Sequence, residues 1–152
     1  MKKYFFSTII IVVLAFSSLC SQTRSFGIGF MAGDPTGLNG KYFLNPNNAV
    51  EVGLGVGVFG SENSFAIHVD YLYHNNTIIQ SSENFPIFYG FGVRVRSKEE
   101  AEFGLGMRGV VGIAWVSQTM PIDIFLQIAP VFKLLPSAKF GIDGAVGARY
   151  YF

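Results

Sequence analysis

Many charged residues in this chain lie two positions away from a glycine or from another charged residue. This pattern could build an enclosed network of ion pairs. Side chains two positions apart on a β-strand share one face of the sheet. A buried charge without a partner is strongly destabilising, so an enclosed set should be paired. We therefore predict a structural ladder of inward charges, with a narrow or gated pore or a proton path as the alternatives. The ladder residues are Glu51, Asp70, Arg94, Arg108, Asp123, Asp143 and Arg149, which Lys41 and Arg96 could join.

The two histidines are the other groups that could do chemistry. His68 and Asp70 share a face two residues apart, and His74 lies near the end of the same segment. A metal or catalytic site needs further converging ligands or a nucleophile, but no further ligand cluster appears and the predicted outward face has no Ser–His pair. The pieces "GIGF" and "GLGVGVFG" lack the helix and lysine of a phosphate loop. We expect packed histidines, no cofactor, no metal and no enzymatic activity.

Eight segments of alternating hydrophobicity carry these residues, and none shows helical periodicity. Short connections rich in Pro, Gly, Asn and Ser separate them, as turns between strands do. The exception is the long connection 75–85. The segments are 25–33, 37–44, 49–59, 64–74, 86–96, 102–116, 121–133 and 139–152.

The two faces of these strands differ in an unusual way. One face is large and apolar, as in Val52, Leu54 and Val56, whereas the other holds the charges and most glycines. Glycine weakens a strand on an open surface but suits a crowded interior, so the glycine face should point inward. An apolar outer wall is stable in lipid, and backbone groups in lipid must be paired by closure of the sheet. The sequence predicts an all-β, closed, eight-stranded, antiparallel, up-and-down transmembrane β-barrel. The inward glycines are 27, 29, 33, 53, 55, 57, 90, 92, 104, 106, 112, 141 and 147.

The totals agree with one exported domain. The 152 residues carry 14% charged side chains, against about 25% in an ordinary soluble domain. The net charge of +1 leaves no basic footprint for nucleic acid. Lys2 and Lys3, the apolar "YFFSTIIIVVLAF" and the small residues of "SSLCSQ" predict a cleavable signal peptide at 1–22, before a barrel domain at 23–152. Cleavage after Cys20 or after Gln22, and lipidation of Cys20, stay open.

Aromatic residues predict which barrel end faces the periplasm. An even number of strands puts both termini on one side, and export makes that side periplasmic. Tyrosine and tryptophan prefer the membrane interface. The predicted periplasmic girdle comprises Tyr71, Tyr73, Tyr89, Trp115 and Tyr150, with Tyr42 and Tyr151 near the same end. The connection 75–85 falls on this side, where tight turns are usual, so either its boundaries shift or it has a separate role.

The C-terminal "GARYYF" resembles the insertion signal of bacterial outer-membrane barrels, through Gly147, Tyr150 and Phe152. The pieces "GDPTGLNGKYF", "VDYLYHN", "FPIFYGFGVRV" and "GMRGVVGIAW" resemble a family of small, largely uncharacterised eight-stranded outer-membrane β-barrels of Gram-negative bacteria. The resemblance covers most of the chain after the signal. It implies the cell outer membrane, contact with its lipid and insertion by the barrel-assembly machinery. It implies no particular activity.

We therefore expect a non-catalytic outer-membrane barrel with a plugged lumen and a structural or membrane-integrity role. A surface receptor or adhesin is the first alternative, since the acidic "SKEEAE" at 97–102 would face outward and could meet an unknown ligand. A narrow pore is another. A soluble lipocalin-like carrier, with the apolar residues turned inward around a ligand, is the last.

Overall fold

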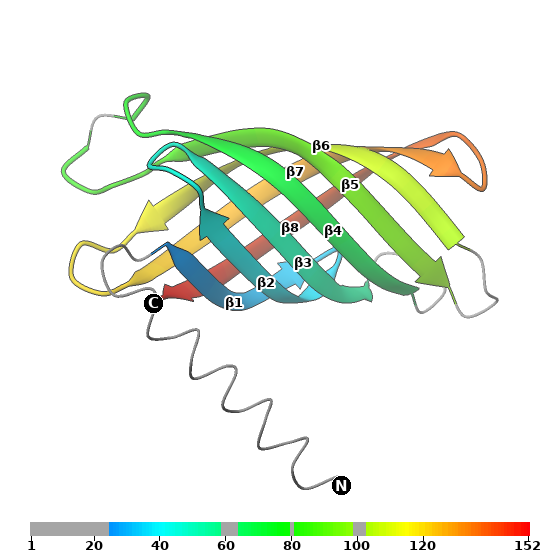
Figure 1. Ribbon diagram of the computed structural model, residues 1–152, viewed down its shortest axis with the longest axis horizontal. Helices are drawn as coiled ribbons and strands as arrows, with labels where there is room; N and C mark the ends of the chain where they lie inside the picture. Colours follow the sequence, from blue (N-terminus) through cyan, green and yellow to red (C-terminus); the bar gives the residue numbers. More distant parts are fainter. Residues whose placement is uncertain (1–24, 59–63, 80, 99–102) are drawn as a thin grey trace, which may run out of the picture.

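The computed structural model describes residues 25–58, 64–79, 81–98 and 103–152 (Figure 1). The predicted signal peptide and Cys20 lie outside these residues. Eight strands account for most of the described chain. They are β1 (Phe26–Gly33), β2 (Thr36–Phe43), β3 (Asn48–Gly57), β4 (Ser64–Asn75), β5 (Ile87–Lys98), β6 (Phe103–Val116), β7 (Ile122–Leu135) and β8 (Lys139–Tyr151).

The strands form a closed barrel in which each pairs antiparallel with the next and β1 pairs with β8. This confirms the predicted fold class. The alternation pattern also located each strand to within two residues at both ends. Among the described residues there is no helix long and apolar enough to cross a membrane.

The connections separate onto two ends of the barrel, seen left and right in Figure 1. We call one the terminal end, because it carries the C-terminus together with the connections after β2, β4 and β6. The strands β1, β3, β5 and β7 end at the opposite end of the barrel, which we call the far end. The long connection between Asn75 and Ile87 is at the terminal end, as the strand count predicted.

Side chains divide between an apolar outside and a polar inside. On the outer wall, Phe30 and Phe140 are 73% and 68% exposed. On the inner wall, Glu51 and Arg149 are 0% and 1% exposed. The arrangement is the reverse of a soluble sheet protein, in which large apolar side chains fill the interior.

Four inner-wall glycines each pair with a residue of the neighbouring strand whose bulky side chain points inward. In each case a Cβ on the glycine would overlap the ring opposite, so the glycine makes the room that the ring occupies. The glycine–ring pairs are Gly27 with Tyr151, Gly53 with His68, Gly112 with Phe88 and Gly147 with Phe125.

The interior also holds an apolar cluster that includes Leu72, Phe88, Val110 and Phe125. The alternating sequence pattern predicts glycines and charges on the inner face and does not distinguish these apolar residues. They fill the volume that the glycines leave, because a folded interior packs closely. The interior is therefore a mixed core of apolar and charged layers.

Candidate functional site

Arg149 on β8 organises the ion pairs nearest the terminal end. It donates to both carboxylate oxygens of Asp123, from Nε at 2.9 Å and from Nη2 at 3.0 Å. Its Nη1 donates to Glu51 Oε2 at 2.6 Å and to Asn39 Oδ1 at 3.0 Å. Asp123 Oδ2 also accepts from the Tyr151 hydroxyl at 2.7 Å. Four strands therefore meet on one guanidinium, a geometry suited to bidentate recognition of carboxylates.

Lys41 on β2 extends this set toward the terminal end. Its Nζ lies 3.2 Å from His74 Nε2 and 3.8 Å from Glu51 Oε2. The ammonium also sits 4.7 Å from the ring centre of Phe88 and 5.7 Å from that of Phe43. These contacts hold the lysine head at one place near the barrel axis.

A second group of ion pairs crosses the middle of the lumen. Arg108 Nε lies 3.2 Å from Asp70 Oδ1, and Arg108 Nη1 lies 3.6 Å from Asp143 Oδ2. Arg94 donates to the same Asp143 carboxylate. The nearby cavity, lined by Met31, His68 and Arg108 among others, has no volume that a water molecule could occupy. The middle of the barrel is closed by side chains.

Opposite charges form pairs along the described part of the lumen. At the far end Arg96 Nη2 donates to Asp34 Oδ1 at 2.7 Å. Within the described strands and turns, the ion pairs join the cations Lys41, Arg94, Arg96, Arg108 and Arg149 to the anions Asp34, Glu51, Asp70, Asp123 and Asp143. Five positive groups thus face five negative ones.

The structure places all seven ladder residues on the inner wall and brings them into two groups. Asn39 and Tyr151 join the Arg149 group, and Asp34 pairs with Arg96 at the far end, but none of the three was among the predicted set. Asn39 lies two positions from Lys41, and this spacing indicates that both side chains share the inner face. Nothing in the sequence placed Asp34, which precedes β2 in a turn, beside Arg96 on β5.

One cluster has the donor types of a metal site. Ligand atoms of Glu51, His68 and Asp70 lie within 4.8 Å of one another, and Glu51 Oε1 and both ring nitrogens of His68 have no hydrogen-bond partner among the described residues. His74 belongs instead to the Lys41 contact. The carboxylates of Glu51 and Asp70 already face Arg149 and Arg108, so a divalent ion would add buried positive charge beside two guanidinium groups. Charge balance favours a structural role for this cluster.

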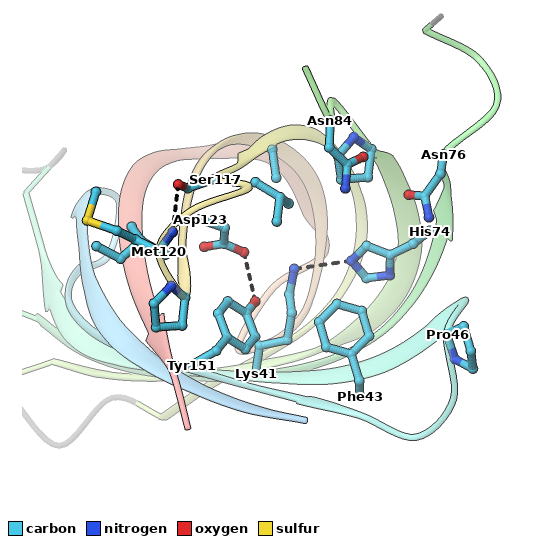
Figure 2. Close-up of a pocket in the computed structure, with 15 residues that line it drawn as sticks. Lys41, Phe43, Pro46, His74, Asn76, Asn84, Ser117, Met120, Asp123 and Tyr151 are labelled. Atoms are coloured by element: carbon cyan, nitrogen blue, oxygen red, sulfur yellow. Dashed lines mark hydrogen bonds between the residues drawn. The ribbon is translucent and has the colours of Figure 1, made fainter. Parts of the chain in front are cut away.

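A pocket of about 230 Å³ opens at the terminal end, above the Lys41 head (Figure 2). We call it the terminal pocket. Lys41, His74, Asp123 and Tyr151 form its polar part. Most of its remaining wall is apolar, with Asn76, Asn84 and Ser117 as further polar residues. The other lining residues are Phe43, Pro46, Pro86, Ala114, Val116, Met120, Pro121 and Ile122.

Asn76, Asn84 and Pro86, from the described part of the long connection after β4, line one part of this pocket. The backbone N–H groups of Ala114 and Val116 donate to the carbonyls of Pro86 and Asn84, both at 3.0 Å. Trp115 Nε1 donates to Glu83 Oε2 at 3.1 Å. The described part of the connection is therefore tied to the end of β6. The sequence assigns this segment no definite role, and in the structure its described residues form part of the pocket wall.

The predicted aromatic girdle gathers at the terminal end of the outer wall. The ring centres of Tyr71 and Tyr73 are 5.2 Å apart, and those of Tyr73 and Tyr89 are 5.9 Å apart. The ring centres of Tyr150 and Phe152 are 5.1 Å apart. Tyr151, by contrast, points into the lumen and hydrogen-bonds Asp123. Adjacent residues of a strand face opposite ways, which separates the two tyrosines.

The C-terminal motif sits at the barrel seam. Gly147 pairs with Phe125 on β7 and with Met31 on β1. The Phe152 backbone N–H donates to the Phe26 carbonyl at 2.9 Å. The motif thus lies where the last strand closes on the first.

Comparisons with protein-family models, with curated proteins and with solved structures gave no significant match.

Proposed function

We propose that this protein is a non-catalytic integral β-barrel of the Gram-negative outer membrane, with a closed lumen and a structural or membrane-integrity role. The observation that carries the proposal is the inverted distribution of side chains. Ile128, Leu126 and Ile142 on the outer wall are 52%, 54% and 66% exposed. A contiguous apolar wall of this kind is suited to lipid. The strands β4 to β8 have 12 to 14 residues, which exceeds the about 9–11 needed to cross a bilayer at a tilt.

The filled interior supports a structural role over a pore. Eight-stranded barrels have an interior only wide enough for side chains. Here Arg108, Asp70 and Asp143 pair across the middle, beside a cavity with no room for water. An open conduction path would need those pairs to separate.

A lipocalin-like carrier is the alternative with a different chemistry. Such a carrier holds its ligand among apolar side chains inside the barrel and presents polar ones to water. The described interior instead holds five balanced ion-pair partners of each sign. This distribution favours the membrane proposal.

Fractionation and gel mobility test the proposal. The full chain, expressed in a Gram-negative host, should sediment with the outer membrane. It should migrate differently on detergent gels before and after heating, because a closed barrel resists unfolding by detergent alone. Recovery of the unheated protein in the soluble periplasmic fraction would show that the proposal is wrong.

A further inference from the structure

The terminal pocket contains a hydrogen-bond donor that its surroundings leave partly unused. Lysine carries three N–H donors and no acceptor. Within the described residues, the hydrogen bond found for Lys41 Nζ is to His74 Nε2 at 3.2 Å. Glu51 Oε2 at 3.8 Å is beyond hydrogen-bond distance. At least one N–H of Lys41 is therefore available to a bound molecule.

The Asp123 carboxylate and the His74 ring nitrogen beside Lys41 are already engaged. Both oxygens of Asp123 accept from Arg149, and Oδ2 also accepts from Tyr151. His74 Nε2 faces the Lys41 ammonium, which can only donate. A molecule that uses the free N–H of Lys41 must therefore bring an acceptor.

Charge balance indicates what kind of acceptor fits. Lys41 and Arg149 are matched by Glu51 and Asp123, and all four are buried. An anion placed on this floor would add a negative charge without a free cation, at a large desolvation cost. An uncharged carbonyl or ether oxygen would accept the Lys41 N–H without that cost.

The walls and the size of the pocket define the rest of the molecule. Phe43, Val116, Met120 and Ile122 contribute apolar surface around the floor. The volume of about 230 Å³ is below the roughly 300–1,000 Å³ of pockets that hold drug-sized ligands. A short apolar body would fit it.

We propose that the terminal pocket binds a small, uncharged, mostly apolar molecule whose one hydrogen-bond acceptor takes an N–H of Lys41. This adds a binding function to the structural role. It depends on the floor and walls of the pocket and not on which way the barrel crosses a membrane, so each proposal can fail without the other.

Methionine methyl groups provide the readout and its internal control. Met120 lines the pocket, Met31 is 3% exposed inside the barrel and Met107 is 59% exposed on the outer wall. The protein, labelled at methionine methyl carbons and held in lipid nanodiscs, is titrated with 2-heptanone and observed by NMR. We expect a saturable shift of the Met120 signal and no saturable shift of Met31 or Met107. Parallel shifts of Met120 and Met107 that rise without saturation would mean partition into lipid and would overturn the proposal.

Two analogues test the chemistry of the acceptor. Heptane has the apolar body without an oxygen, and heptanoate replaces the carbonyl by a charged carboxylate. We expect the Met120 signal to saturate at a 2-heptanone concentration at least about tenfold lower than the concentration of heptane or of heptanoate that is needed. A tenfold difference is about what one hydrogen bond of ordinary strength contributes to binding. Equal or tighter binding of heptane or heptanoate would contradict the assigned ligand class.

Variants test the residues. Lys41→Met removes the donor and should raise the dissociation constant of 2-heptanone about tenfold, whereas Lys139→Met at the far end should leave it unchanged. Because Lys41→Met also unbalances buried charge, a second variant acts on the wall alone. Val116→Phe should abolish the saturable Met120 shift by filling the pocket, while Val56→Phe on the outer wall should not. Unchanged binding in either pocket variant would overturn the proposal.

Discussion

Gly112 on β6 lies directly opposite Phe88 on β5, and the Phe88 ring occupies the space that a Cβ at position 112 would need. The Leu126 carbonyl closes the same space from the other side. Replacement by any larger residue must move a ring or a strand. The relationship shows why glycine is placed in strand interiors despite its low strand propensity.

Gly112→Ala should lower the free energy of unfolding by about 1–3 kcal/mol, the usual cost of overpacking a filled core. Gly109→Ala on the same strand is the matched control, because the nearest atom to its Cβ would be Pro130 Cγ at an ordinary 3.7 Å. That change should be neutral or slightly stabilising, since alanine restricts the unfolded chain. Denaturant unfolding in lipid vesicles measures both. Equal losses in the two variants would contradict the steric explanation.

Removal of Arg149 should be the most damaging loss of a lumen cation. Arg149→Met leaves Glu51 and Asp123 buried without their principal partner, which costs about 3–5 kcal/mol. Arg96→Met is the comparison, because Arg96 is 15% exposed at the far end and, within the described residues, forms its ion pair with Asp34. We expect a clearly smaller loss there. Unfolding free energies that rank the two variants in the opposite order would refute the assignment of Arg149 as the centre of the network.

Arg108→Ala tests whether the central ion pairs gate a pore. Asp70 loses its guanidinium partner, while Asp143 keeps Arg94. The variant should melt at a lower temperature, because a buried carboxylate is left unpaired. Its conductance in planar bilayers should stay at the level of the unmutated protein, since the surrounding side chains still fill the lumen. A large, stable conductance in either protein would support a pore instead.

Ile128→Arg distinguishes a lipid-facing wall from a water-facing one. Ile128 is 52% exposed near the middle of β7. In a bilayer, arginine at mid-depth costs about 2–4 kcal/mol. On a surface in contact with water the same change would stay within about 0.5 kcal/mol.

Leu134→Arg provides the matched control for this test. Leu134 is 40% exposed on the same strand but close to its far end. Near the interface the cost of arginine falls to about 0–1 kcal/mol. Unfolding free energies measured in vesicles should therefore separate the two variants. Small and equal effects would argue against the membrane proposal.

Local alternation in the sequence determined the strands and the direction of their side chains. Val52, Leu54 and Val56 point outward and Glu51 points inward because successive residues of a strand face opposite ways. Only short-range information is needed for that assignment. The predicted strand positions and the closed barrel therefore agree with the structure.

The partners of the inward residues were decided by tertiary structure. Arg149 and Glu51 are 98 residues apart and meet because closure of β8 on β1 brings their strands around one axis. The register of β5 against β6 sets Phe88 across from Gly112, and the assembled barrel places Lys41 in the lining of the terminal pocket. These contacts depend on register and strand tilt, which the spacing of residues along a single strand does not specify.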